Sequence, residues 1–333
     1  MYAAIMVPLD GSTWADAAIP VAVDLARRSG AMLELVHVHA PLLHPSEALT
    51  FFPRGDDEEP SVRRAQLETT AARVRETSGL TVVATFLTGP VVATLEAHVD
   101  ARGPDLIVMT THGLGGPSRF LLGSVADVLL RHTGVPILLV RRGPSTPDRA
   151  DDDDRPLFRR VLIPLDGSER AEAVIVHAIA LGDPDATEFI LVSVVVPLLV
   201  TGDRWADARP SIAREPVDVF VRHERETSAY LDQIATELRQ CGMTVTTRVV
   251  VHAQAARALL DAAVECHADV VAIATHGRPP LSRWVIGSVA DRIVRGTDVP
   301  VLVFRATPAA TRQPEPDDLP ETTAEAHAAP AAS

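Results

Sequence analysis

Short apolar runs rich in Val, Ile and Leu alternate with segments of helical periodicity along most of the chain. In the first half they predict a strand that ends at Asp10 and further strands at residues 32–39, 81–87, 105–110 and 136–141. In the second half they predict strands at residues 160–165, 188–195, 244–251, 269–274 and 300–305. This alternation favours an α/β fold, with parallel sheets covered by helices on both faces.

The intervening segments carry helix start and stop signals. Helices are expected over residues 12–28, 61–77 and 90–100, and again after Gly123. Ser12 is the expected cap of the first helix, and Pro20 should kink it. Apolar positions recur with helical spacing after Gly123-Ser124, which predicts an amphipathic helix with Ser124 at or near its N-cap.

Two segments occur twice. Asp10-Gly11-Ser12, which follows the first strand, returns as Asp166-Gly167-Ser168. The longer segment 111–127 returns as 275–291, and both copies begin Thr-His-Gly and end Gly-Ser-Val-Ala-Asp. The chain is therefore a tandem repeat, and its 333 residues suit two domains of ~150 residues.

The repeat sets the expected domain boundaries. We expect a first domain at residues 1–142, an acidic linker at 143–157 and a second domain at 158–305. Residues 306–333 are rich in Pro and Ala without periodicity, which predicts a disordered tail. The polar residues 44–60 are expected to form a mobile surface loop.

Composition narrows the possible functions. The formal charge of −13 argues against a nucleic-acid or anionic-membrane surface, which needs clustered Lys and Arg. The longest apolar run, 189–200, is too short to cross a bilayer, and no basic segment precedes the first strand as in a signal peptide. Cys241 and Cys266 match no metal or disulfide spacing, so we expect reduced thiols in a cytoplasmic protein.

The duplicated Gly-Ser at a helix start is the main candidate for chemistry. Gly123-Ser124 and Gly287-Ser288 each follow a strand and a glycine-bearing loop, so backbone N–H groups gather at the positive end of a helix dipole. Phosphates bind well in such places. The alternative is a plain helix cap, but a cap does not require a nine-residue loop duplicated in both halves.

Asp10 and Asp166 are compatible with two roles. Each can make an Asx turn that leads into the next helix. Each also stands at the carboxyl end of a strand, where open α/β sheets bind ligands. The strand position favours the ligand role.

The remaining polar candidates are weaker. His37 and His39 have metal-ligand spacing, but the second half has Ser193 and Val195 there, which favours packing histidines. His112 and His276 lack an accompanying nucleophile and are expected to shape the loop or contact phosphate. Arg119 and Arg283 suit either phosphates or an interface, and the scattered Trp14, Trp205 and Trp284 suit packing or surface positions.

These motifs resemble the universal stress protein family in its tandem two-domain form. ATP-binding members carry Gly-x2-Gly-x9-Gly-Ser/Thr, whose second part is matched by Gly113 with Gly123-Ser124 and by Gly277 with Gly287-Ser288. Thr110 and Ala274 stand in place of the first glycine, and a positive φ would strain either residue. The resemblance covers residues 1–142 and 158–305.

The resemblance implies a ligand and an architecture. The ligand would be ATP, with or without Mg, or another adenine nucleotide. Asp10 and Asp166 would lie by the adenine and ribose, the main chains of Val38 and Val194 would contact the adenine edge, and the Gly-Ser turns would hold the phosphates. The implied binding residues are Asp10, Val38, Thr110, Gly113, Gly123, Ser124 and Val125, with Asp166, Val194, Ala274, Gly277, Gly287, Ser288 and Val289 in the second half.

Each half would be an open, Rossmann-like five-stranded parallel sheet in the order 3-2-1-4-5. The fifth strands, 136–141 and 300–305, would pair across an internal two-fold, because each is otherwise an exposed apolar edge. A homodimer is a further expected partner arrangement. Pro279-Pro280 removes two backbone donors from the second loop, which predicts tighter binding in the first half.

Three function classes follow. The first is a nucleotide-binding stress-response regulator that acts through conformation or partner choice. The second is a nucleotide-free universal stress protein that acts by dimerisation and protein interaction. The third, an adenylating enzyme, ranks last because Pro8-Leu9-Asp10-Gly11-Ser12 lacks the patterns of such enzymes and no general base is evident. We therefore expect no enzymatic role beyond slow ATP hydrolysis.

Overall fold

The computed structural model describes residues 2–41, 59–111, 122–141, 157–197, 199–201, 212–214, 217–276 and 287–306. The expected disordered tail lies outside these residues except for Ala306, and the expected linker except for Leu157. The expected loop at 44–60 lies outside them up to residue 58.

Strands and helices alternate as the apolar pattern predicts. The first half contains β1 (Ala4–Pro8), η1 (Ala15–Ala17), α1 (Ala18–Ser29), β2 (Met32–His39), α2 (Pro60–Ser78), β3 (Val82–Thr88), α3 (Val91–Arg102), β4 (Leu106–Thr110), α4 (Ser124–His132) and β5 (Ile137–Val140). The second half contains β6 (Arg160–Pro164), α5 (Glu169–Glu172), α6 (Ile175–Leu181), β7 (Glu188–Val195), β8 (Leu199–Thr201), β9 (Ile212–Arg214), α7 (Val217–Gln240), β10 (Thr244–Val251), α8 (Ala255–Glu265), β11 (Val270–His276), α9 (Ser288–Gly296) and β12 (Val301–Ala306).

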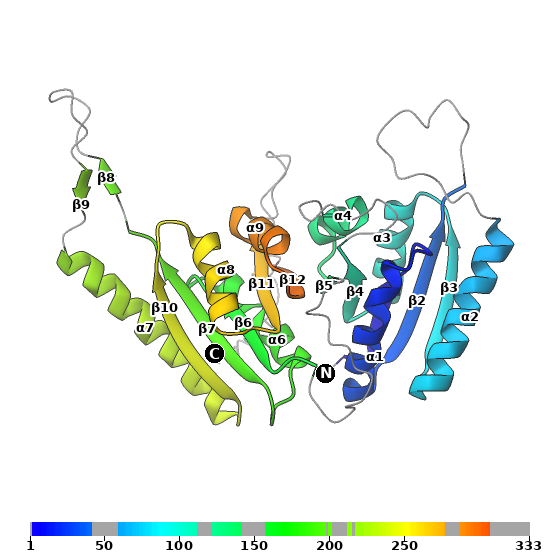
Figure 1. Cartoon of the computed structure of the whole chain (residues 1–333), viewed down its shortest axis with the longest axis horizontal. Helices are drawn as coiled ribbons and strands as arrows, with labels where there is room; N and C mark the ends of the chain where they lie inside the picture. The colour runs from blue at the N-terminus through cyan, green and yellow to red at the C-terminus, as the bar shows by residue number, and fades with distance from the viewer. Residues whose placement is uncertain are drawn as a thin grey trace, which may run out of the picture.

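Ten of the described strands form one sheet in the order β10-β7-β6-β11-β12-β5-β4-β1-β2-β3. Each half is parallel and has the predicted order 3-2-1-4-5. Figure 1 shows the two halves side by side, with β5 and β12 in the middle. The fold is therefore the predicted α/β arrangement, in which two parallel five-stranded units share one sheet.

The two units meet where β12 runs antiparallel to β5. Leu138 pairs with Leu302, flanked by the pairs of Leu139 with Val301 and Ile137 with Val303. These residues are 1% exposed or less. Each apolar edge strand therefore covers the other, as expected from the cost of leaving such an edge open.

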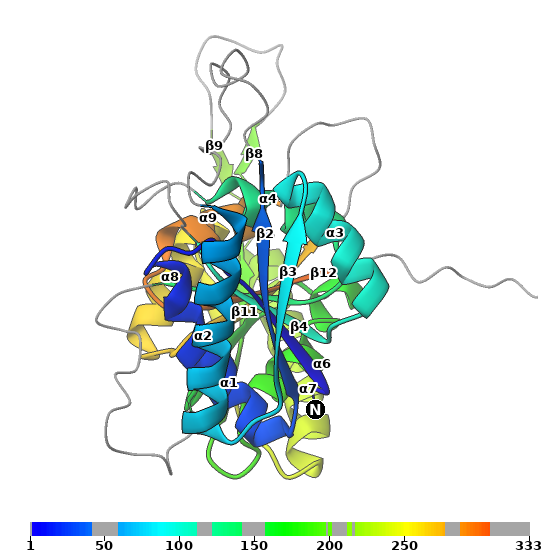
Figure 2. The same ribbon diagram turned by 90° about the vertical axis from the view of Figure 1, so that its right-hand side faces the viewer.

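Helices cover both faces of the sheet. In Figure 2, α1 and α2 lie on one side of β2 and β3, and α3 and α4 lie on the other. One buried cluster holds Leu25 of α1, Leu67 of α2 and Leu231 of α7, and the opposite cluster holds Leu129 of α4 and Ile293 of α9. Each cluster contains residues of both halves, so the junction joins two cores as well as two edges.

Reciprocal arginines reinforce the junction. Arg141, just after β5, donates to the carbonyl of Val294 in α9, and Arg305 of β12 donates to the carbonyl of His132 in α4 at 3.2 Å. Partial burial lowers the pKa of the Arg141 guanidinium, and nearby Asp298 opposes that shift. Two equivalent arginines thus link each half to the last helix of the other.

The first helix differs from its prediction. The expected helix over residues 12–28 is replaced by η1 and by α1, which begins at Ala18. Pro20 is the third residue of α1, where a backbone N–H would have no partner within the helix, so its missing donor costs nothing. The predicted kink in the middle of a helix was therefore wrong. Ser12 accepts from the Ala15 amide at 3.2 Å, but the N-cap residues of η1 and α1 are Trp14 and Ala17, so the predicted capping by Ser12 was wrong.

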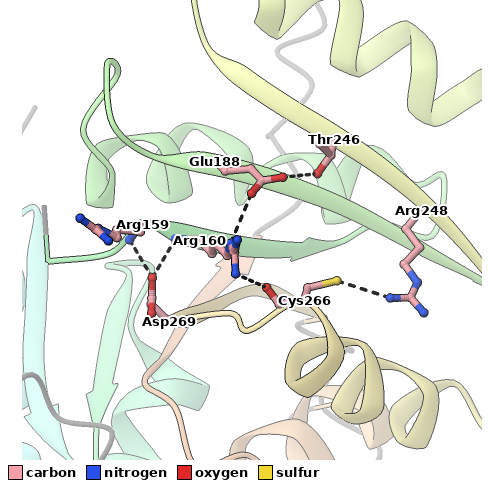
Figure 3. Close-up of polar contacts among 7 residues, drawn as sticks. All are labelled: Arg159, Arg160, Glu188, Thr246, Arg248, Cys266 and Asp269. Carbon is pink, nitrogen blue, oxygen red and sulfur yellow. Dashed lines mark hydrogen bonds and ion pairs between the residues drawn. The ribbon is translucent and has the colours of Figure 1, made fainter.

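An aspartate at the start of the fourth strand of each half fixes the start of the first strand. Oδ2 of Asp105 accepts from the amides of Ala3 (2.6 Å) and Ala4 (2.9 Å). Oδ2 of Asp269 accepts from the amides of Arg159 (2.8 Å) and Arg160 (2.9 Å), as Figure 3 shows. This paired contact sets the register of the strands that carry the candidate site.

The neighbouring polar contacts involve one cysteine. Arg160 donates to the Cys266 carbonyl and pairs with Glu188, whereas Arg248 contacts the Cys266 sulfur at 3.5 Å and pairs with Glu265. Cys266 and the exposed Cys241 are free thiols, as predicted. Among the described helices, none is long and apolar enough to cross a membrane.

Replacing Leu139 with Lys should destabilise the protein by about 3 kcal/mol or more, because an unpaired ammonium would be buried at the junction. Thermal unfolding and size-exclusion chromatography measure the effect. Val264→Lys is the control, since Val264 on α8 is 74% exposed. An unchanged melting temperature and hydrodynamic size for Leu139→Lys would contradict the observed pairing.

Replacing Asp105 with Ala should cost about 1 kcal/mol, because two backbone amides lose a charged acceptor. Asp269→Ala should have a similar effect through the second half. Urea unfolding gives the free energies, with Asp100→Ala on exposed α3 as the control. Losses no larger than that of the control would show that these aspartates do not clamp the strands.

Candidate functional site

The candidate site lies where the strand order reverses in each half. β1 lies between β2 and β4, and β6 lies between β7 and β11. The chain leaves β1 and β4 toward opposite sides of the sheet, so the carboxyl ends of these strands flank a crevice. The duplicated Asp-Gly-Ser and Gly-Ser segments both lie at these strand ends.

The two Asp-Gly-Ser turns have the same geometry. Oδ1 of Asp10 accepts from the amide (2.9 Å) and hydroxyl (2.5 Å) of Ser12. Oδ1 of Asp166 accepts from the amide (3.0 Å) and hydroxyl (2.6 Å) of Ser168. Gly11 and Gly167 both have φ of 80°, a conformation that only glycine adopts without strain. The Asx turn is therefore present in both halves, at the carboxyl ends of β1 and β6.

The Gly-Ser segments begin α4 and α9. Gly123 and Gly287 are the N-cap residues, whereas Ser124 and Ser288 are the first helical residues and are exposed. Neither N-cap glycine has a side chain that could cap its helix, and Ser124 lies next to the N-cap, within the expected bounds. Ser168, by contrast, caps α5 through its Oγ. The backbone N–H groups in the first turns of α4 and α9 are therefore hydrogen-bond donors that suit an anion.

The two helix starts differ in backbone conformation. Gly123 has φ of −58°, and its amide donates to the Thr111 carbonyl at 2.8 Å. Gly287 has φ of 54°, a conformation that favours glycine, whereas at Gly123 an added Cβ would lie 3.2 Å from the Thr111 carbonyl oxygen. The sequence pattern, which is the same in both halves, does not predict this difference.

Thr110 and Ala274 fit their positions without strain. Thr110 ends β4 and pairs with Val140, and Ala274 lies within β11 and pairs with Phe304. Both are half-buried, and neither has a positive φ. The strain expected from replacing the first glycine is therefore absent, because extended β backbone suits any residue here.

Val38 and Val194 lie at the strand ends beside the Asp-Gly-Ser turns. The last pair between β1 and β2 is Pro8 with Val36, and the Leu9 amide donates to the Val36 carbonyl at 2.8 Å. Backbone N–H and C=O groups point to alternate sides along a strand. Those of Val38 therefore point toward the same side as those of Val36, beyond the last pair between β1 and β2. Val194 stands in the same relation to Val192. Val125 and Val289 are half-buried and pack against the core beneath α4 and α9.

The strand histidines pack as predicted. Nδ1 of His37 donates to the Leu9 carbonyl at 2.9 Å. The rings of His37 and His39 lie 5.5 and 6.1 Å from the Phe86 ring, and Arg64 lies over that ring at 4.6 Å. Among the described residues, no group of three His, Cys, Asp or Glu side chains is arranged to hold a metal ion.

An ionisable group near each Asp-Gly-Ser turn has a shifted pKa. Burial raises the pKa of the Asp16 carboxyl, with Arg73 opposing the shift and Asp10 adding to it. Near the second turn, the Tyr230 hydroxyl donates to Oε1 of Glu172 at 2.9 Å. Burial and this hydrogen bond raise the pKa of Tyr230, so its hydroxyl stays neutral at physiological pH.

Sequence reasoning missed two features of the first half. Glu34 of β2 is buried, accepts from Thr85 at 2.6 Å and pairs with His98 of α3 at 3.0 Å. Its neighbours satisfy its charge, which indicates a structural role. Arg63 of α2 lies against Gly11, and the adjacent basic residues Arg63 and Arg64 at the start of a polar helix were the available signal.

Several predicted residues lie outside the described part of the chain. They are Gly113, Gly277, His112, Arg119, Arg283, Trp205 and Trp284. His276 ends β11, and only its backbone is described. The site is therefore defined by the strand ends, the Asp-Gly-Ser turns and the starts of α4 and α9.

Comparison with known proteins agrees with this arrangement. The chain is 27% identical over 309 residues to a universal stress protein of Mycolicibacterium smegmatis, which covers 90% of this chain and 96% of the relative. It is 27% identical over 203 residues to one from Mycobacterium tuberculosis, covering 60% of this chain and 62% of the relative. A universal stress protein from Archaeoglobus fulgidus has a similar fold, with a TM-score of 0.62 at 19% identity, covering 91% of this chain and 96% of that structure.

The family model provides the decisive match. The description of that model is the universal stress protein family, and it matches residues 1–141 and 157–305. The two matched segments correspond to the two five-stranded units, which meet at β5 and β12. This chain therefore belongs to the universal stress protein family.

Proposed function

We propose that the chain binds an adenine nucleotide, ATP with or without Mg or a related nucleotide, at the carboxyl edge of its sheet. The bound nucleotide would set the conformation or the partner choice of a stress-response regulator. The observation that carries the proposal is the start of α4, whose N-cap Gly123 has no capping side chain and donates to the Thr111 carbonyl just after β4, the neighbour of β1 at the reversal of strand order.

The site offers complementary groups for the parts of a nucleotide. The helix starts at Ser124 and Ser288 supply backbone donors for phosphates. Val38 directs main-chain groups toward the crevice, where they suit a base edge. The Asp10 carboxylate follows β1, the strand between β2 and β4, and it would suit ribose hydroxyls. We assign the same roles to Asp166 and Val194 in the second half.

The alternative is a universal stress protein that works by dimerisation without nucleotide. Its support is the absence of the first glycine of the ATP-binding pattern at Thr110 and Ala274. Neither residue adopts the strained conformation that would exclude a ligand from its neighbourhood. The nucleotide-binding proposal therefore has the stronger geometric support.

Ser124→Asp combined with Ser288→Asp should abolish nucleotide binding. Both serines are exposed first residues of helices, so aspartate would fit and would stabilise the helix dipole. Its carboxylate would also repel phosphate. Calorimetric titration with ATP and magnesium measures binding, and mass spectrometry of the denatured protein identifies any nucleotide that co-purifies.

Gly134→Asp is the control, because it adds a carboxylate beyond the other end of α4, where no atom lies within 4 Å of an added Cβ. This variant should bind ATP like the original protein. The proposal is refuted if the unmutated protein is purified without bound nucleotide and does not bind ATP at concentrations up to millimolar. That result would favour the nucleotide-free alternative.

A further inference from the structure

The turn after the first strand has different neighbours in the two halves. Cζ of Arg63 would lie 2.9 Å from a Cβ added at Gly11, so the guanidinium occupies the space that a side chain would need. An added Cβ at Gly167 would meet nothing within 4 Å. The backbone is the same in both, with φ of 80°. Among the described residues, the second half therefore has no cation against its turn like the one in the first half.

The two helices that follow the second strands align well enough to identify the counterpart of Arg63. Leu67 and Ala71 of α2 are buried against the sheet, as are Leu231 and Ala235 of α7. Arg75 donates to the Val82 carbonyl at 2.7 Å, and Arg239 donates to the Val245 carbonyl at 3.0 and 2.8 Å. In this alignment Thr227 takes the place of Arg63, Ser228 that of Arg64 and Tyr230 that of Gln66.

The counterparts cannot supply a positive charge. Thr227 donates to the His223 carbonyl of its own helix at 2.8 Å. Tyr230 donates to Glu172, beside the Asp166 turn. Arg170 of α5 is exposed and lies between the acidic residues Glu169 and Glu172 in the sequence. Among the described residues, the Glu172 carboxylate and the neutral Tyr230 hydroxyl thus lie near the second turn.

Helix stability does not explain the position of Arg63. It is the fourth residue of α2, whose first turn has no acidic residue. A cation near a helix N-terminus is disfavoured by the helix dipole. Gln66 accepts from Nη1 of Arg63 at 3.2 Å, which orients the guanidinium on the side of α2 that faces the turn. Arginine in this position suits bidentate binding of an anion.

We propose that Arg63 is a specificity-determining residue that directs phosphate-bearing ligands to the first half. Its guanidinium lies against the turn after β1, and β1 is paired with β4, which leads to α4. The guanidinium and the start of α4 therefore both lie at the carboxyl ends of two neighbouring strands. The second half, with Thr227 in the corresponding place, binds polyphosphate more weakly. This inference rests on the proposed nucleotide binding.

The test compares ATP with adenosine, which has the same base and ribose but no phosphate. Full-length protein with Arg63→Thr, the residue of the second half, should bind ATP about tenfold more weakly, the usual scale for loss of a charged hydrogen bond. Its affinity for adenosine should stay within twofold. Thr227→Arg should strengthen ATP binding at the second half in a two-site titration with magnesium.

Arg64→Ser is the matched control, because it removes the same charge from the neighbouring position, where the guanidinium lies over Phe86. It should weaken ATP binding much less than Arg63→Thr. Equal losses in the two variants, parallel losses of ATP and adenosine, or unchanged ATP affinity in Arg63→Thr would each overturn the role of Arg63. If the original protein binds ATP in those cases, the proposed function stands. No ATP binding by the original protein would overturn both.

Discussion

The antiparallel pairing of β5 with β12 is the contact on which the rest of the structure depends. Two parallel sheets of this topology each end in an apolar strand, and an open edge of that kind invites aggregation. Pairing the two edge strands within one chain leaves neither edge open to aggregation. It also makes the buried cluster on each face continuous across the two halves. The reciprocal contacts of Arg141 and Arg305 follow from the same approximate symmetry.

This symmetry places two candidate sites on one frame while leaving them free to differ. The backbone features are duplicated, namely the Asx turns at Asp10 and Asp166 and the helix starts at Ser124 and Ser288. The side chains around them are not, since Arg63 lies against one turn and Glu172 with Tyr230 lies near the other. A duplicated fold with diverged surroundings suits one strong and one weak site.

The sequence predicted those features that depend on local pattern. β7 and β10 have the predicted bounds, because runs of alternating β-branched residues bounded by polar residues identify strands well. The start of α1 was wrong because Pro20 is compatible with either the middle of a kinked helix or its first turn, and tertiary packing decides between them. The hairpin of β8 and β9 was not predicted, since three-residue strands carry little periodicity.

For the candidate site, the duplicated motifs predicted which segments lie at the strand ends. They did not predict the φ of 54° at Gly287, because both copies read Gly-Ser. The contact between Arg63 and Gly11 joins residues far apart in the chain, so the adjacent basic residues Arg63 and Arg64 did not identify its partner. Glu34 was missed for the same reason, because its partners Thr85 and His98 come from β3 and α3.

A crystal structure of the full chain grown with ATP and magnesium is the most direct test of the central claim. The account predicts a nucleotide in the first half, with its phosphates at the start of α4 and within reach of Arg63, and lower occupancy or none in the second half. A first half without nucleotide at saturating ATP, or a nucleotide bound only at α9, would contradict it.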